Sequence, residues 1–315
     1  MRTSVLDIRP TGLFLYELRD PAPKIPSLPT TPTTIKHQPK TLPPQTTNPS
    51  TNHQQLTDKT PYTGKLTERS KRRLQRAIAL MLACTPWKTA PLLKTKGTFR
   101  YQIGFLTLTL PAPQGEYTDK ELKKRLLDPY IKRLKRKYHL KSYIWRAERQ
   151  KNGNLHFHLM IDTWIRHTDL RNDWNALLAT LGYIDIFEQK HGHRNPNSID
   201  IHAVKRAKNL AAYLVKYMSK PEASDDVILG KVWDCSANLK RKDRCRLPWD
   251  QTCSLAWAAA SRHPEAKVLE RDHFSAVLLR HDLLKQCLPP DLKAYYLSYL
   301  DSIHFDRPAP QTPRS

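Results

Sequence analysis

The stretch that decides the fold runs from Lys141 to Asp162 and reads KSYIWRAERQKNGNLHFHLMID. Two runs in it, 141–150 and 155–162, alternate apolar and polar residues, which is the period of a β-strand with one buried face. Asn152 and Gly153 stand between them, and an Asn-Gly pair between alternating runs is among the strongest short-range indications of a β-hairpin. We therefore expect two adjacent antiparallel strands at the centre of the fold.

Two histidines in the second strand, His156 and His158, leave the same face of the hairpin because side chains alternate along a strand. If the loop has three residues, with Gly153 in the left-handed conformation, Glu148 lies opposite His156. A two-residue turn would send Glu148 to the other face. One carboxylate and two imidazoles with open positions suit Mg²⁺ or Mn²⁺ acting on a phosphate oxygen. Taken alone, the histidines are equally compatible with a structural or surface pair, because the chain has 13 of them.

Outward from the hairpin, the sequence predicts an α+β domain with a central antiparallel sheet flanked by helices. A capping box of Thr118 and Glu121 opens the first helix, and Pro129 should kink it. The expected order is β-α-β-β-α-β-β-α. The elements outside the hairpin are a strand over 101–110, a helix over 118–138, a helix over 169–181, strands over 183–188 and 198–204, and a helix over 206–219.

The last predicted helix carries a polar stripe, because its residues at i, i+3, i+4 and i+7 are Tyr213, Lys216, Tyr217 and Lys220. An amphipathic helix with packed aromatics and solvated lysines would explain these residues. However, the helix has a separate apolar face of Leu210, Leu214 and Met218, so the tyrosines have no obvious packing role. A free phenol has a pKa near ~10, so a nucleophilic tyrosine needs a nearby cation. Lys216 is placed to supply one.

Three motifs follow one another in order: FLTLT at 105–109, the two histidines with Glu148 upstream, and YLVKYMSK at 213–220. Together they resemble the HUH endonucleases, specifically the two-tyrosine rolling-circle replication initiators of small single-stranded DNA phages and plasmids. The resemblance covers Phe99 to Lys220. The later segment GKVWDCS, at 230–236, is similar to one that follows the tyrosine helix in phage-type members.

The resemblance implies an HUH domain that nicks and rejoins single-stranded origin DNA through a 5′-phosphotyrosine intermediate. Tyr213 and Tyr217 would be the nucleophiles, Lys216 would offset negative charge, and Mg²⁺ or Mn²⁺ would be held by His156, His158 and Glu148. The third ligand varies in the family, so Asp200 or His202 are alternatives to Glu148. The implied partners are the origin DNA and a host helicase and polymerase, in the host cytoplasm. A mobilisation relaxase or a single-strand transposase would share this chemistry.

Charge supports a nucleic-acid partner, because 53 Lys and Arg against 29 Asp and Glu give a net charge of +24. Residues 66–83 read as a basic helix, which could be either a solvated helix face or a phosphate-binding surface. A non-catalytic nucleic-acid-binding protein would explain the charge but not the tyrosine stripe. A non-haem iron oxygenase fits neither the charge nor the HxH spacing. The predicted nucleic-acid contacts are Lys220, Arg72, Arg73, Arg76 and Arg146.

Composition divides the rest of the chain. Residues 21–61 are rich in Pro and Thr and poor in large apolar side chains, so we expect 1–61 to be disordered. The other expected divisions are a basic helical segment at 62–98, the HUH domain at 99–223, a mainly helical extension at 224–300 with helices near 253–261 and 274–288, and a disordered tail at 301–315. No apolar run is long enough to cross a membrane. The five scattered cysteines indicate reduced thiols rather than disulfides or a zinc site.

Overall fold

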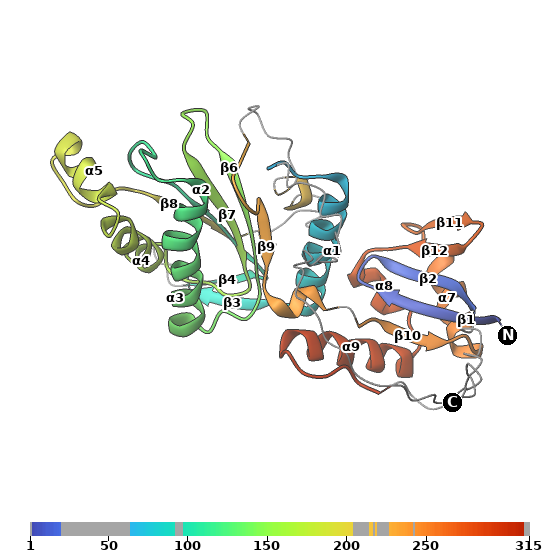
Figure 1. Ribbon diagram of the computed structural model, residues 1–315. Helices are drawn as coiled ribbons and strands as arrows, with labels where there is room; N and C mark the ends of the chain where they lie inside the picture. Colours follow the sequence, from blue (N-terminus) through green and yellow to red (C-terminus); the bar gives the residue numbers. More distant parts are fainter. Residues whose placement is uncertain are drawn as a thin grey trace, which may run out of the picture.

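The computed structural model (Figure 1) describes residues 2–19, 64–91, 97–203, 214–216, 218, 227–241 and 243–311. These residues form a mixed α+β structure with two five-stranded antiparallel sheets and a small two-stranded one, β3 (Lys88–Pro91) with β4 (Thr98–Tyr101). Helix α1 (Glu68–Cys84) lies between the two large sheets in Figure 1. The predicted class and the predicted basic helix are therefore confirmed.

The central sheet has the strand order β8-β5-β7-β6-β9, and every neighbouring pair is antiparallel. Its strands are β5 (Gly104–Leu108), β6 (Tyr143–Arg149), β7 (Leu155–Ile161), β8 (Ile199–Ala203) and β9 (Trp233–Cys235). The edge strand β9 lies beyond residue 223, where we expected this domain to end. That boundary is wrong because Trp233–Cys235 pairs with β6 and completes the sheet.

The β6–β7 hairpin closes with the predicted three-residue loop. The N–H of Gln150 donates to the carbonyl of Asn154 at 2.8 Å, and the N–H of Gly153 donates to the carbonyl of Gln150 at 2.9 Å. Gly153 has a φ of 82°, in the left-handed region that glycine adopts without strain. The register consequently places Glu148 opposite His156, as predicted.

Each face of the central sheet is covered by a different layer of helices. One face, with Leu106 and Phe157 among its buried residues, packs against α3 (Asp128–Tyr138) and α4 (His167–Ala179). The opposite face contributes Phe105 and Met160 to a second core cluster, which includes residues of α1 and the helical residues Leu214 and Met218. The candidate site lies on this second face.

The predicted helix over 118–138 forms as three consecutive pieces. Its capping box is present, with α2 (Asp119–Leu122) followed by a π-helical segment, Lys123–Leu127, and then by α3. Pro129 stands in the first turn of α3. Because proline has no N–H to donate to the preceding turn, the expected irregularity takes the form of a change in helix type directly before it.

The predicted strand over 183–188 is wrong, because the segment is helix α5 (Tyr183–His191). Gly182 and Gly192 flank it with φ values of 78° and 74°, and both serve as its caps. Tyr183 and Ile184 are buried, and these adjacent apolar residues match a helix as well as a strand.

The second large sheet, here called the terminal sheet, has the order β10-β1-β2-β12-β11. Its strands are β1 (Arg2–Arg9), β2 (Gly12–Arg19), β10 (Cys245–Pro248), β11 (Lys267–Arg271) and β12 (Phe274–Leu278). The prediction that residues 1–61 are disordered is thus wrong for 2–19, and residues 20–63 lie outside the described part. Gly12 is needed here, because a Cβ on it would lie 2.0 Å from the carbonyl oxygen of Val277.

The C-terminal extension is not mainly helical, because it supplies β9, β10, β11 and β12. Its helices are a 3₁₀ turn, Ala237–Lys240, then α7 (Gln251–Ser261), α8 (His281–Cys287) and α9 (Pro290–His304). The predicted helix near 253–261 is confirmed, whereas 274–288 begins with a strand and becomes helical only at α8. The predicted disordered tail is wrong for 301–304, which complete α9.

One core cluster holds the terminal sheet, α9 and α1 together. Buried Leu6 and Leu13 of the terminal sheet belong to the same cluster as Ile78 of α1 and Tyr296 of α9. All five cysteines are free thiols, as predicted. None of the helices in the described ranges is long and apolar enough to cross a bilayer.

This packing makes the N-terminal strands a part of the stable fold. Leu6→Ala is expected to lower the free energy of unfolding by about 2–5 kcal/mol, because the side chain is fully buried. The matched control is Leu255→Ala on α7, whose side chain is 60 % exposed and should change stability by less than ~0.5 kcal/mol. Urea denaturation followed by tryptophan fluorescence measures both. Equal stability of the two variants would exclude a structural role for β1.

Candidate functional site

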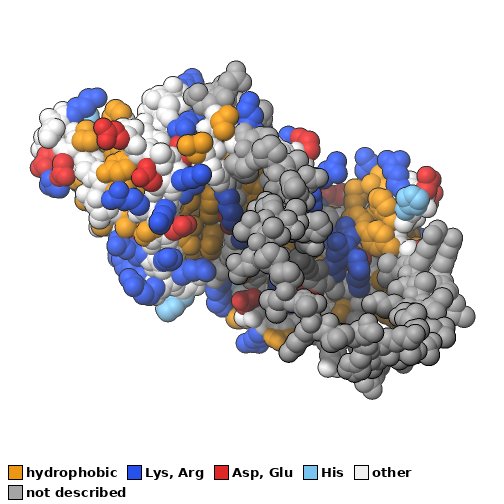
Figure 2. Space-filling model, viewed as in Figure 1, with side chains coloured by type: hydrophobic (Ala, Val, Ile, Leu, Met, Phe, Trp, Pro, Cys, Tyr) orange, Lys and Arg blue, Asp and Glu red, His pale blue; other side chains and the backbone are white. Residues whose placement is uncertain are grey.

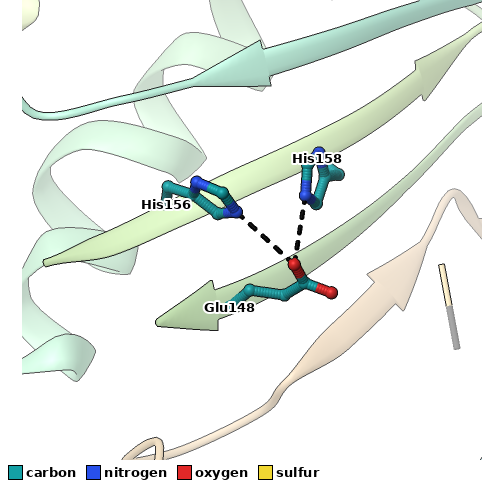
Figure 3. A group of neighbouring side chains, drawn as sticks. All are labelled: Glu148, His156 and His158. Atoms are coloured by element: carbon teal, nitrogen blue, oxygen red, sulfur yellow. Dashed lines mark hydrogen bonds and ion pairs between the residues drawn. The ribbon is translucent and has the colours of Figure 1, made fainter. Parts of the chain in front are cut away.

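Glu148, His156 and His158 point toward one another from neighbouring strands (Figure 3). Oε2 of Glu148 lies 3.2 Å from Nε2 of His158 and 3.5 Å from Nε2 of His156. One candidate ligand atom from each residue lies within 4.8 Å of the other two. The histidine side chains are 14 % exposed and that of Glu148 is 20 % exposed, so the cluster is partly enclosed but reachable from solvent.

The sheet register explains why these three residues meet. His156 and His158 alternate with the buried Phe157 on β7, so both imidazoles leave one face. On the adjacent β6, Glu148 is the direct partner of His156. Directly opposed side chains in an antiparallel pair have Cβ atoms about 5 Å apart, which places a glutamate within reach of both rings.

Glu148 is held in its ionised form. Burial opposes ionisation, but the adjacent imidazoles of His156 and His158 and the charge of Arg146 outweigh it and keep the pKa of Glu148 well below its ordinary value. Nη1 of Arg146 lies 3.3 Å from Oε1 of Glu148. Arg146 therefore holds one carboxylate oxygen while the other faces the imidazoles.

Arg146 was predicted to contact nucleic acid, and the structure places it differently. Its side chain is fully buried on β6, opposite His158, and forms the ion pair with Glu148. It lies on the face that carries the site, because residues two apart on a strand share a face. Arg146 is thus a residue that positions Glu148, and as a surface contact to DNA it is a wrong prediction.

The two imidazoles have different surroundings. Nδ1 of His158 lies 3.2 Å from Oγ1 of Thr107, its partner on β5, and the His158 ring stacks on Phe105 with 5.5 Å between centroids. Both ring nitrogens of His156 are buried and make no hydrogen bond within the described part of the chain. A buried imidazole without a hydrogen-bond partner is costly unless something else satisfies it.

These donors suit a divalent cation. Neutral imidazole nitrogens and a carboxylate kept ionised are ligands of Mg²⁺ and Mn²⁺, and the unsatisfied nitrogens of His156 fit such an ion. A ligating histidine usually hydrogen-bonds a second residue through its other nitrogen, as His158 does with Thr107.

The alternative ligands Asp200 and His202 lie apart from this cluster. Both are exposed on β8, which β5 separates from β7 in the sheet. Oδ2 of Asp200 lies 2.6 Å from Nε2 of His202, so the two pair with each other. The observed cluster contains Glu148 rather than either of them.

The tyrosine helix is described in part. Residues 214–216 and 218 are helical, with Leu214 and Met218 fully buried, which agrees with the predicted apolar face, and with Lys216 exposed. Tyr213, Tyr217 and Lys220 lie outside the described residues. Their predicted roles therefore stay predictions.

The basic helix α1 exposes Arg72, Arg73 and Arg76 to solvent. Its apolar face packs into the core cluster that also holds Phe105 and Met160 of the site face, and Nε1 of Trp233 on β9 donates to Oγ of Ser70 at 2.6 Å. Arg76 also donates to the carbonyl of Arg241 at 3.4 Å. The exposed arginines thus lie on a helix that covers the layer of the candidate site.

Removing positive charge from α1 should weaken DNA binding. We expect Arg72→Gln with Arg73→Gln to reduce the slope of log K against log salt by about 0.7 for each lost contact to a single strand. Lys132→Gln with Arg136→Gln removes the same charge from the exposed side of α3, across the sheet, and serves as the control. Binding isotherms at several salt concentrations measure the slopes. Identical slopes for the two double variants would show that α1 makes no phosphate contact.

Sequence reasoning missed the supporting roles of Phe105, Thr107 and Arg146. Alternation alone places Arg146 on the face of Glu148, which was available from the hairpin. The contact of Thr107 with His158 depends on β5 pairing with β7, a partnership between strands about 50 residues apart that no local pattern reveals.

Fold and site together define an α+β protein with an antiparallel sheet that carries two histidines and a glutamate on one face. Residues 103–222 match the model of a family described as replication-associated protein of the ORF2 type, and this stretch includes Glu148, both histidines and the 213–220 motif. In this segment the chain is similar to replication-associated proteins, which agrees with the resemblance to rolling-circle replication initiators. No curated protein and no solved structure matches the chain.

Proposed function

We propose that this protein is a rolling-circle replication initiator that cleaves and rejoins single-stranded origin DNA through a 5′-phosphotyrosine intermediate. The observation that carries the proposal is the convergence of Glu148, His156 and His158 on one sheet face within the segment that matches the replication-associated family. The net charge of +24 supports a DNA substrate, because it attracts the phosphate backbone independently of sequence.

In the proposed reaction, the phenol oxygen of Tyr213 or Tyr217 attacks the scissile phosphorus. The bond from phosphorus to the 3′ oxygen breaks, and that oxygen leaves as a 3′ hydroxyl after taking up a proton. Because one phosphate ester replaces another, attack by a 3′ hydroxyl on the phosphotyrosine restores the DNA and frees the phenol. The exposed ammonium of Lys216 would offset charge on the phenolate or the phosphate.

His156, His158 and Glu148 would hold Mg²⁺ or Mn²⁺. When bound, such an ion polarises a phosphate oxygen and aligns it. Arg146 keeps Glu148 oriented and ionised for this task, and Thr107 fixes the ring of His158.

The test is to incubate the protein with labelled single-stranded DNA carrying its origin, with Mn²⁺, and to separate the products under denaturing conditions. A protein–DNA adduct that survives denaturation, with a free 3′ hydroxyl on the released fragment, is the expected result. Cleavage without an adduct would contradict the tyrosine chemistry. Autonomous maintenance of an origin-bearing circle separates an initiator from a relaxase or a transposase, which do not support it.

A further inference from the structure

The terminal sheet has one face that the core does not use. Leu6, Ile8 and Leu13 point to the inner face, where they join the core cluster with α1 and α9. Because side chains alternate, the residues between them belong to the outer face. On the two middle strands β2 and β12, this outer face carries Phe14, Tyr16 and Phe274, all partly exposed.

These three rings form one aromatic cluster. Phe14 and Tyr16 lie two residues apart on β2, with centroids 6.4 Å apart and ring planes within 10° of parallel. Phe274 lies 5.9 Å from Tyr16 and 6.5 Å from Phe14. Exposed aromatic residues are usually scattered, so three in contact on the solvent side of a sheet indicate a binding surface.

Basic residues border the cluster on both sides. Arg9, Arg244 and Arg246 lie on or beside β1 and β10, and the exposed Lys267 and Arg271 project from the outer face of β11. The guanidinium of Arg9 lies 4.0 Å from the ring centroid of Phe14. Figure 2 shows this side of the molecule as a hydrophobic patch bordered by Lys and Arg side chains.

A buried carboxylate organises three of the arginines. Oδ2 of Asp7, whose side chain is fully buried, lies 2.9 Å from Arg9, 3.3 Å from Arg244 and 3.6 Å from Arg246. Arg9 also donates to the hydroxyl of Tyr16. Asp7 is the acidic side chain among the described outer-face residues of these strands, so one negative charge stands against five positive ones.

We propose that the outer face of the terminal sheet binds single-stranded DNA, with bases stacked on Phe14, Tyr16 and Phe274 and phosphates paired with the bordering arginines. Aromatic rings with adjacent cations bind unpaired strands, because every base offers a ring face while its phosphate carries the charge. Paired bases are already stacked within a duplex, so the rings would favour single strands. The inference rests on the proposed function in taking DNA as the substrate, and it adds a second DNA contact on the terminal sheet, beside the central-sheet site.

The first experiment compares affinities of the full chain for a labelled oligothymidylate of about 20 nucleotides. Phe14→Leu with Phe274→Leu keeps the apolar bulk but removes the rings, and we expect affinity for this single strand to fall at least about tenfold. Affinity for a duplex of the same length should change less than about twofold. Phe305→Leu is the matched control, because Phe305 is also exposed and has Lys141 and Arg307 against its ring.

The second experiment uses the unmodified protein, so it does not depend on a variant folding. An oligothymidylate with 5-iodouracil replacing thymine is irradiated in complex with the chain, and the crosslinked residues are identified by mass spectrometry. Crosslinks at Phe14, Tyr16 or Phe274 are expected. Crosslinks confined to other parts of the chain, or equal loss of affinity for single strand and duplex in the double variant, would overturn the proposal, as would formation of a dimer through this face.

The two proposals fail separately. A chain that forms no covalent adduct, but loses single-strand affinity in the double variant, refutes the cleavage reaction and keeps this DNA-binding face. A chain that forms the adduct, but whose double variant binds single strands as tightly as the Phe305→Leu control does, keeps the reaction and refutes this face.

Discussion

Replacing both Tyr213 and Tyr217 by phenylalanine is expected to abolish the covalent protein–DNA adduct, with adduct formation falling by more than about 1,000-fold. Phenylalanine keeps the ring and its packing while deleting the nucleophilic oxygen. DNA affinity should stay within about twofold, because phosphate contacts elsewhere dominate binding. Denaturing gels of the labelled origin strand measure the adduct, and filter binding measures the affinity.

The single variants separate a two-tyrosine enzyme from a one-tyrosine enzyme. The two residues are one helical turn apart, about 6 Å along the axis, so both hydroxyls can reach one phosphate site. We expect one single variant to form an adduct still and neither to complete repeated rounds of cleavage and joining. Tyr117→Phe, which removes a hydroxyl from a tyrosine outside the site, is the control and should leave activity unchanged.

Two results would contradict this assignment. An adduct that persists in the double variant would place the nucleophile at another residue. Full activity of one single variant through many turnovers would mean that one tyrosine suffices, which would favour a relaxase or a transposase over a two-tyrosine initiator.

The parts of the fold that depend on local sequence were predictable. The parity of the 151–153 loop fixed which side chains share a face, so the meeting of Glu148 with His156 followed from the position of Gly153. The capping box at Thr118 and Glu121 likewise marked the start of α2.

The parts that depend on distant partners were not predictable. Residues 2–19 alternate well enough to form strands, but a hairpin alone is only marginally stable in water. They become the centre of a sheet because β10 and β12, more than 200 residues later, pair with them on both sides. Compositional bias in the neighbouring 21–61 obscured this segment.

Burial was the second limit on prediction. Arg146 reads as one more cation in a basic chain, and only the packed structure shows that it is enclosed beside Glu148. A buried guanidinium is retained where a carboxylate pairs with it, so the same residue type serves the site instead of the surface. The sign of its charge was informative about the site, but its position was not available from composition.

Substituting the clustered ligands is expected to eliminate cleavage without eliminating DNA binding. We expect Glu148→Gln, His156→Ala and His158→Ala each to slow adduct formation at least about 100-fold, since each deletes a ligand to the proposed ion. Excess chelator should have the same effect on the unmodified protein. Affinity for the origin strand should change less than about threefold, because this cluster supplies few of the phosphate contacts. Calorimetric titration with Mn²⁺ alone should show binding to the unmodified chain and its loss in all three variants.

His202→Ala is the matched control, because His202 has the same side chain on the same face of the central sheet but pairs with Asp200 on β8, outside the cluster. It should bind Mn²⁺ and form the adduct within about twofold of the unmodified protein, as expected for an exposed side chain away from the site. The reverse pattern, with activity lost in His202→Ala and kept in Glu148→Gln, would transfer the third ligand from β6 to β8. Undiminished cleavage in excess chelator would exclude the metal altogether, and the two imidazoles would then have to act on the phosphate as charged groups or proton donors. The Mn²⁺ titration and the cleavage assay together distinguish these outcomes, since a ligand must fail both measurements and a proton donor only the second.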